Sequence, residues 1–268
     1  MISPLSDRMR PRSLSEIVGQ ENWLGKGAPL WQAVTQGIPR SIILWGPPGC
    51  GKTSTAFVIA KSCDLTFTKL SAVLDGVPSL RKVLAHAEKE RASSGKPVLL
   101  FVDEIHRWNK AQQDALLPHV ERGDIVLIGA TTENPSFQLI PALRSRLQVI
   151  ALTPIETPHL TALLQRALID EERGLGLPAV TFTEDALKSI AVMAAGDCRR
   201  ALDDLERAAT FGAQAPPVTV EVVQQALQRT DIFHDRDGEA HYNVLSALIK
   251  SMRASNPDAA LYLSLIHI

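Results

Sequence analysis

A glycine-rich loop holds the residues of this sequence that are best suited to bind an anion. Its pattern is G-x-x-x-x-G-K-[ST], in which glycines let successive backbone N–H groups point at phosphate oxygens. In this pattern Lys52 reaches the β- and γ-phosphates, and the hydroxyl of Thr53 binds Mg²⁺. We therefore expect a site for a nucleoside triphosphate and a magnesium ion. The candidate residues are Gly46, Pro47, Pro48, Gly49, Cys50, Gly51, Lys52, Thr53 and Ser54.

The segments on either side of this loop fit the structural context that the loop needs. Ser41–Trp45 is a short apolar run suited to a buried strand, and residues 54–61 have the composition of a helix. The N-terminus of that helix adds partial positive charge beside the loop. Upstream of the loop, Ile17 and Val18 either wrap the nucleotide base or pack against the sheet.

Two carboxylates follow a second apolar run. Residues 98–102 are apolar and too few for a helix, so they predict a strand that is buried on both faces. Asp103 and Glu104 then lie at the carboxyl end of this strand, where open α/β sheets bind ligands. We expect Asp103 to hold Mg²⁺ through its water shell, because a hard cation prefers oxygen ligands. Glu104 is expected to polarise the attacking water as a general base.

Strands alternate with helices through the first part of the chain. This alternation indicates an α/β fold with a parallel sheet of five strands, covered by helices on both faces. The strand at 125–130 also ends in polar residues, Thr131 to Asn134. We expect the five strands at 41–45, 66–70, 98–102, 125–130 and 148–152, and helices between them at 54–63, 78–91 and 109–121.

The composition becomes helical after residue 153, which divides the chain into three predicted domains. Residues 1–153 form a nucleotide-binding α/β domain, residues 154–230 a small helical domain, and residues 231–268 the beginning of a C-terminal helical domain. The apolar end at 263–268 predicts either that the natural protein continues or that these last residues are not native. In the small helical domain we expect helices at 157–173, 183–195, 196–211 and 219–229.

Composition and charge restrict the class of protein. The net charge is −1, so any contact with nucleic acid must come from a local patch. Residues 61–96 carry seven Lys or Arg against four acids, which fits either a nucleic-acid face or a solvated helix surface. The three cysteines lack C-x-x-C spacing, which favours a reducing compartment and no zinc site. Cys50 is either a small tolerated loop residue or a thiol whose oxidation blocks nucleotide binding.

No targeting or membrane signal stands out in the sequence. The first 15 residues carry three arginines but lack the apolar core of a secretory signal. No apolar run approaches the roughly 18 residues of a membrane span. The sequence therefore predicts a cytoplasmic protein without a membrane partner.

The ordered set of motifs resembles the AAA+ ATPases, in their clamp-loader-like branch. Several stretches are more specifically similar to the replication-associated recombination protein A family, whose eukaryotic relative is the Werner-helicase-interacting protein. The similarity covers about residues 7–262. The stretches are Arg8–Pro11 with Val18–Gln20, Trp45–Gly49, Leu70–Val73, Asp103–Arg107, Gly129–Phe137, His241-Tyr242 and Lys250–Arg253.

The resemblance implies ATP and Mg²⁺ as cofactors and assigns roles to further residues. Thr132 or Asn134 matches the first sensor, which positions the water or detects the γ-phosphate. Arg146, with Arg144 as the alternative, matches the arginine finger that reaches into a neighbouring subunit's site. Arg199 matches the second sensor, a lid arginine that contacts the nucleotide of its own subunit.

The resemblance also implies a function in DNA metabolism. We expect a DNA-dependent ATPase that acts at stalled or gapped replication forks, with single-stranded or forked DNA and the single-strand-binding protein as partners. The family forms tetramers through a longer C-terminal domain. We also expect a location in the bacterial cytoplasm, in association with the nucleoid. The alternatives are a clamp-loader subunit, a Holliday-junction branch-migration motor subunit, and a scaffold that ATP binding gates for recruitment of partners.

Overall fold

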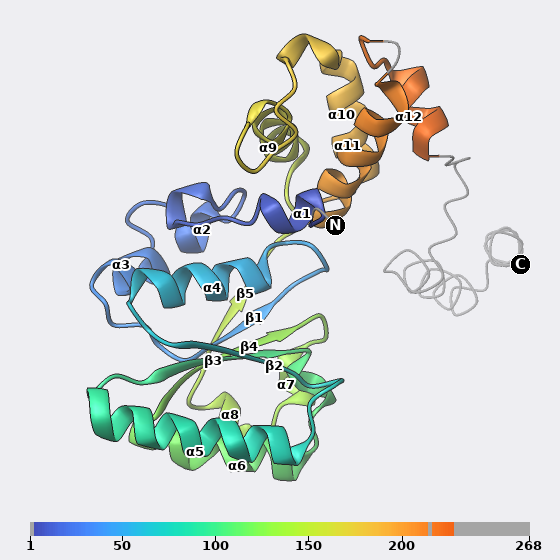
Figure 1. Ribbon diagram of the computed structural model, residues 1–268. Coiled ribbons are helices and arrows are strands. Elements are labelled where there is room, and N and C mark those ends of the chain that lie inside the picture. The colour runs from blue at the N-terminus through green and yellow to red at the C-terminus, as the bar shows by residue number, and fades with distance from the viewer. Residues whose placement is uncertain (1–2, 214–215, 228–268) are drawn as a thin grey trace, which may run out of the picture. The chain divides into compact units, whose positions relative to one another are not determined.

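The computed structural model describes residues 3–213 and 216–227 (Figure 1). None of the helices in these ranges is long and apolar enough to cross a membrane. The third predicted domain, from residue 231, and the apolar end of the chain lie outside the described residues.

Five parallel strands form one sheet, as predicted, and their order is β2-β3-β4-β1-β5 (Figure 1). The central strands β3 and β4 are apolar and almost completely buried, because helices cover both of their faces. Trp45 at the end of β1 pairs with Thr131 at the end of β4, and Ser71 at the end of β2 pairs with Asp103. The polar strand ends therefore meet at one edge. The strands are β1 Ile42–Trp45, β2 Phe67–Ser71, β3 Val98–Asp103, β4 Ile125–Thr131 and β5 Gln148–Ala151.

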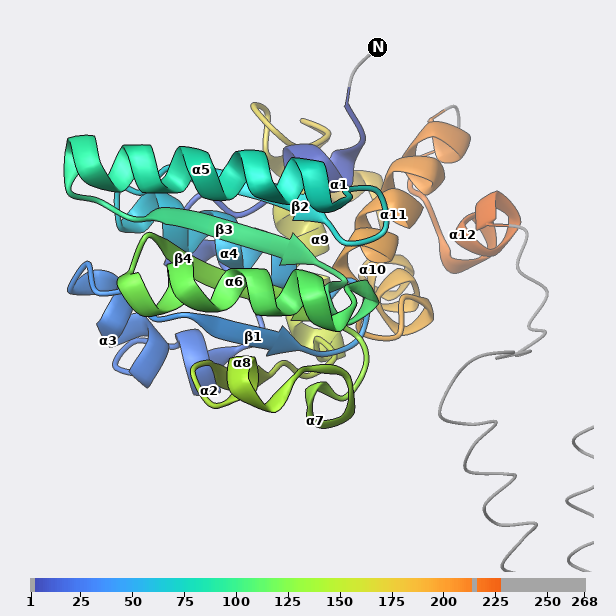
Figure 2. The same ribbon diagram turned by 90° about the horizontal axis from the view of Figure 1, so that it is seen from below.

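Helices cover the two faces of the sheet (Figures 1 and 2). On one face α4 packs through Ile59 against a cluster that includes Leu44 and Phe101. On the other face α5 and α6 pack through Leu84 and Leu116. The bounds are α2 Glu21–Leu24, α3 Pro29–Thr35, α4 Lys52–Ser62, α5 Val77–Ser94, α6 Lys110–Arg122, α7 Pro135–Gln138 and α8 Pro141–Arg144, with 3₁₀ turns at Leu14–Glu16, Ile105–Arg107 and Ala179–Thr181.

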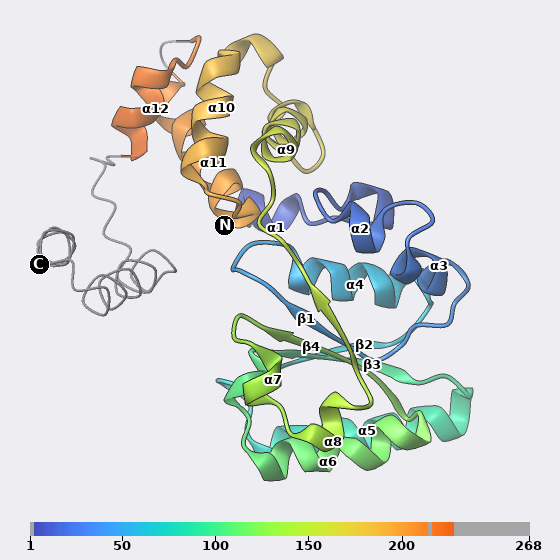
Figure 3. The ribbon, with the colours of Figure 1, turned by 180° about the vertical axis from the view of Figure 1, so that it is seen from behind.

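The chain leaves the sheet through β5 and enters a group of helices with its own apolar cluster (Figure 3). Thr183 and Asp197 begin α10 and α11 by accepting hydrogen bonds from Ala186 N, at 3.2 Å, and Arg200 N, at 3.0 Å. The helices are α9 Thr157–Ile169, α10 Glu184–Met193, α11 Cys198–Gly212 and α12 Val220–Leu227. We use the name lid for residues 157–227.

The first lid helix ends earlier than predicted, at Ile169 instead of Arg173. Asp170 leaves the helical conformation, and its Oδ1 accepts hydrogen bonds from Glu172 N at 3.0 Å and Arg173 N at 2.8 Å. This side chain offers the backbone a turn in place of another helical turn. The sequence prediction overlooked this competition.

The N-terminal segment, residues 3–18, packs on the lid. Leu5, in the short helix α1 Leu5–Arg8, and Met9 are buried in the lid cluster. The Arg8 guanidinium pairs with Glu206 at 3.0 Å and donates to Gly174 O at 2.7 Å. Two further ion pairs, Arg12–Glu172 at 2.8 Å and Arg173–Glu16 at 2.9 Å, extend this contact. The segment thereby shares its apolar core with helices more than 150 residues later in the chain.

Candidate nucleotide-binding site

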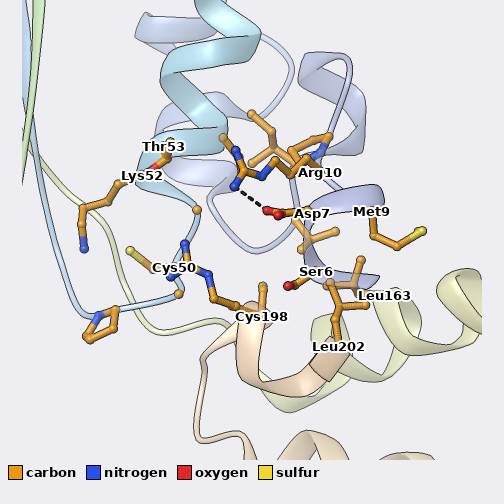
Figure 4. Close-up of a pocket in the computed structure, with 18 of the residues that line it drawn as sticks. Ser6, Asp7, Met9, Arg10, Cys50, Lys52, Thr53, Leu163, Cys198 and Leu202 are labelled. Atoms are coloured by element: carbon orange, nitrogen blue, oxygen red, sulfur yellow. Dashed lines mark hydrogen bonds and ion pairs between the residues drawn. The ribbon is translucent and has the colours of Figure 1, made fainter. Parts of the chain in front are cut away.

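A cavity of about 250 Å³ lies between the glycine-rich loop, the carboxyl end of β3, the N-terminal segment and the lid (Figure 4). Lys52 and Thr53 lie on one side of it, and Asp7, Met9 and Arg10 lie on the other. Four of the predicted site residues do not line it, namely Gly46, Pro47, Asn134 and Arg146. Those that do are Ile17, Val18, Pro48, Gly49, Cys50, Gly51, Lys52, Thr53, Ser54, Asp103, Glu104, Thr132 and Arg199.

The loop depends on two glycines in the left-handed region. Gly49 has φ +68° and Gly51 has φ +96°. Residues that carry a Cβ atom rarely adopt such positive φ angles, whereas glycine does so readily. A Cβ on Gly49 would lie 1.8 Å from Oδ1 of Asp197 in the lid, whereas a Cβ on Gly51 would meet open space. The backbone N–H of Cys198 also donates to Gly49 O at 3.2 Å. The lid therefore touches the loop at Gly49.

The ammonium group of Lys52 is buried against the loop itself. Lys52 is the first residue of α4 and is 8% exposed. Its Nζ donates to Gly46 O and Pro47 O, both at 2.8 Å. Within the described part of the chain, no carboxylate forms an ion pair with this group. A buried cation held by carbonyl groups alone suits an anionic ligand. Gly46 and Pro47 thus contribute by orienting Lys52 and not by lining the cavity.

The two carboxylates lie at the edge of the sheet, as their sequence positions predicted. Asp103 ends β3, and its Oδ2 lies 3.4 Å from Nζ of Lys69. Glu104 has φ +53° and ψ +44°, a conformation that costs a residue with a side chain about 1–3 kcal/mol. Its Oε2 lies 3.5 Å from Oγ1 of Thr132. Oxygen donors from Thr53 and Asp103 line the same cavity and form a donor set that suits Mg²⁺.

The two candidates for the first sensor occupy different positions. Thr132 lines the cavity beside Glu104. Asn134 instead caps α7, where its Oδ1 accepts a hydrogen bond from Ser136 N at 2.9 Å. Only Thr132 of the two lies where it can touch a ligand of this cavity.

The predicted arginines are also separated. Arg199, at the start of α11, lines the cavity. Arg146 pairs with Glu121 at 2.6 Å and donates to Ala142 O at 2.7 Å. Arg144 donates to Ser136 O at 2.8 Å. Arg146 is therefore outside the cavity of its own chain.

Sequence reasoning named Ile17 and Val18 in the wall opposite the loop but missed the rest of this wall, which the N-terminal segment and α9 provide. Arg10 and Asp7 form an ion pair at 2.5 Å in this wall, and Leu163 and Leu202 add apolar surface (Figure 4). Arg166 lines the cavity too, and its buried Nε has no hydrogen-bond partner in the described part of the chain. The spacing of Leu163 and Arg166 on one face of α9 was the available signal.

Three titratable groups near the cavity have shifted pKa values. Burial opposes ionisation of Glu16, but the hydrogen bonds from Arg173 and from the backbone N–H of Arg12, together with the charges of Arg173 and Arg166, outweigh it, so the pKa of Glu16 lies below its ordinary value. Burial raises the pKa of the Cys50 thiol. Burial, with the charge of Asp197, raises the pKa of Cys198 to about 12. Because both thiols stay protonated near neutral pH, Cys50 fits the interpretation as a small, inert loop residue.

The comparisons with known proteins agree with this geometry. Residues 42–155 match the family model described as "ATPase family associated with various cellular activities (AAA)", and residues 176–253 match the "AAA C-terminal domain". Thermotoga maritima RuvB, described as a Holliday junction branch migration motor, superposes with a TM-score of 0.69 at 28% identity, covering 92% of this chain and 81% of that chain. The fold and the site define an α/β P-loop protein of the AAA+ class.

Curated relatives with similar sequences indicate which group within the AAA+ class this chain resembles. Replication-associated recombination protein A of Coxiella burnetii is 47% identical over 97% of this chain, and ATPase WRNIP1 of Dictyostelium discoideum is 40% identical over 97% of it. The chain spans 59% of the first relative and 32% of the second. It is thus an AAA+ protein homologous to replication-associated recombination protein A and WRNIP1, which confirms the resemblance drawn from the motifs.

Proposed function

We propose that this chain binds ATP with Mg²⁺ in the cavity and hydrolyses it. The observation that carries the proposal is the buried Lys52 ammonium, held by carbonyl groups alone, in the same cavity as Asp103 and Glu104. A cation site opposite two carboxylates suits a triphosphate that is bridged by a divalent metal. When bound, Mg²⁺ neutralises charge on the phosphate oxygens.

The residues that line the phosphate side of the cavity have different roles in the proposed hydrolysis. Lys52 and the backbone N–H groups of the loop bind the phosphate oxygens. Thr53 and Asp103 would hold the metal. Glu104 accepts a proton from the attacking water, and Thr132, whose hydroxyl lies beside it, orients that water. We prefer Thr132 to Asn134 as the first sensor, because the amide of Asn134 is engaged as a helix cap.

The remaining predicted residues come from the lid, from the N-terminal segment and, for Arg146, from a neighbouring copy of the chain. Arg199 contacts the nucleotide from the lid, and Ile17 and Val18 contact its base. Arg146 acts on the site of a neighbouring copy, since its own cavity is out of reach. An arginine supplied in this way contributes roughly 10³–10⁵ in rate in other phosphate-loop enzymes.

Substitution of Glu104 with Gln tests the hydrolytic mechanism. The variant loses the base but keeps the shape of the side chain, so it should bind ATP with unchanged affinity and lose turnover by at least about 100-fold. Phosphate release and equilibrium nucleotide binding are the measurements. Glu184→Gln, on the exposed side of α10, is the control. Undiminished turnover of Glu104→Gln contradicts the proposal.

We further propose that the hydrolysis serves DNA replication and recombination near the nucleoid. The proposed partners are DNA, the single-strand-binding protein and other copies of the chain, which together form a tetramer. The names of the curated relatives support this role. The basic stretch at 61–96 adds little support, because Lys69 and Lys96 already pair with Asp103 and Asp64. The test is the ATPase rate with and without single-stranded, forked and gapped DNA. Equal rates in all of these conditions contradict a DNA-dependent ATPase.

The likeness to RuvB favours one alternative, a motor subunit for branch migration. Movement of a four-way DNA junction that depends on hydrolysis would support it. A clamp-loader subunit would instead load a sliding clamp. A scaffold gated by ATP binding would keep its function at forks in the Glu104→Gln variant.

A further inference from the structure

His106 is a buried side chain that links the ends of two neighbouring strands. It lies in the 3₁₀ turn that follows Glu104, and its side chain is 4% exposed. Its Nδ1 is 2.9 Å from Oγ1 of Thr131, the last residue of β4, and 3.4 Å from Oε2 of Glu104. Its Nε2 is 3.3 Å from Oε1 of Glu133. The ring thus contacts both strand ends that carry the proposed chemistry.

The hydrogen bonds of Thr131 determine which ring nitrogen carries a hydrogen. The Thr131 hydroxyl donates to Glu133 O at 3.1 Å and accepts from Glu133 N at 3.0 Å. A hydroxyl group has one hydrogen, and a carbonyl oxygen can only accept, so that hydrogen is not available to His106. Towards the ring the Thr131 oxygen therefore accepts, and Nδ1 of His106 donates. The one hydrogen of Nδ1 is thus directed to Thr131, and the Glu104 carboxylate lies beside this polar N–H, with its Oε2 at 3.4 Å from Nδ1.

We propose that His106 is a positioning residue that holds the Glu104 carboxylate for catalysis. Glu104 has a left-handed backbone conformation. This conformation is unfavourable for a residue with a side chain, and it persists only where the surrounding structure holds it. The contacts of its carboxylate with His106 and Thr132 provide such support. His106 does not itself line the cavity, so it acts through Glu104 and not on the nucleotide.

The same contacts connect the base to the first sensor. Thr131 binds His106, and Thr132 is its neighbour in the chain and lies against Glu104. A displacement of either strand end therefore changes the position of the carboxylate. This inference rests on the proposed function of Glu104 as the general base, and its test must be separable from that function.

Three substitutions of His106 separate positioning from packing. His106→Asn places an amide N–H near the position of Nδ1, His106→Gln places one near Nε2, and His106→Ala removes both. We expect kcat of ATP hydrolysis to fall roughly 10–100-fold in the Ala and Gln variants, the range that hydrogen-bond partners of metal ligands contribute, and to recover within about threefold in the Asn variant. The Kd for ATP should stay within about twofold in all three.

His119→Asn is the matched control, because His119 also contacts a carboxylate, Asp124 at 3.2 Å, but lies before β4, at the opposite edge of the sheet. It should leave kcat unchanged. Equal kcat in the Asn and Gln variants overturns the positioning role, even if the Ala variant fails to fold. A normal kcat in the Ala variant overturns it as well. If Glu104→Gln turns over normally, the proposed function fails, whereas a normal His106→Ala beside an inactive Glu104→Gln refutes the positioning role alone.

Discussion

The two sides of the cavity are built in different ways. The phosphate side consists of consecutive residues, with backbone groups and Lys52 arranged by the glycines of one loop. The opposite wall combines the N-terminal segment with the lid, through contacts such as Arg8–Glu206 and Arg173–Glu16. The first side is determined by local backbone geometry. The second forms only when distant segments have packed together. We therefore expect substitutions in this wall to change nucleotide binding and stability less than substitutions on the phosphate side do.

The largest effect is expected on the phosphate side, from Lys52→Ala. The substitution removes the buried cation, and the Kd for ATP and for ADP should rise about 10- to 100-fold, because hydrogen bonds to charged groups contribute about 1.5–3 kcal/mol each. Isothermal titration is the measurement. Lys61→Ala, on the exposed surface of the same helix, is the control. A Kd that is unchanged by Lys52→Ala would remove the distinction between the two sides.

Gly49→Ala tests the point where the two sides touch. The new methyl group would meet Asp197 and also adopt a positive φ, so the free energy of unfolding should fall by about 1–3 kcal/mol. Denaturant unfolding measures this change. Gly51→Ala has a similar φ without a clash and should cost less. A second substitution, Asp197→Ala, should restore part of the unfolding free energy that Gly49→Ala loses. If Gly49→Ala and Gly51→Ala lower the unfolding free energy equally, the contact between Asp197 and the loop at Gly49 does not restrict that position.

Arg166→Ala tests the opposite wall. The unpartnered Nε in the cavity suits a ligand, and its loss should raise the Kd for ATP and ADP by the same factor, about tenfold, with kcat unchanged. Equal effects on the two nucleotides are expected because this wall is remote from Lys52. Arg207→Ala, exposed on α11, is the control. A loss confined to ATP would place Arg166 at the γ-phosphate, the group that ADP lacks, and would contradict its place in the wall remote from Lys52.

The smallest effect is a pH dependence that Glu16 produces. Its pKa in the folded protein is below the ordinary value of 4.5, so its ionised form adds stability above that pH, and this contribution is lost as the pH falls through the lowered pKa. Glu16→Gln removes it. The difference in unfolding free energy between the chain and the variant should therefore shrink as the pH falls from about 6 to about 3. A difference that grows with acidity contradicts the role of the Arg173–Glu16 contact.

Sequence patterns predicted the sheet and the phosphate side because both depend on neighbouring residues. The apolar runs at β3 and β4 have the length and composition of buried strands. The glycine spacing of the loop, between a strand and a helix, is typical of a phosphate-binding loop. Asp103 and Glu104 lie at a sheet edge because a parallel strand ends there. The early end of α9 was missed, since Asp170 competes for backbone N–H groups through its side chain.

Other assignments required the folded chain. Thr132 and Asn134 differ by two positions and are both polar, and only the cap on α7 shows that Asn134 is engaged elsewhere. No motif assigned a site role to Arg166 or Arg10, because their meeting in one wall depends on packing between the N-terminal segment and the lid.

By itself, the sequence of this protein determined a phosphate-binding loop, two carboxylates at a strand end and the parallel sheet that carries them. These features follow from local spacing and from the burial of apolar runs. The tertiary structure alone decided which polar side chains surround Glu104 and which residues close the cavity opposite Lys52. The physical reason is that a hydrogen bond or an ion pair between residues far apart in the chain exists only once apolar packing has brought those residues together.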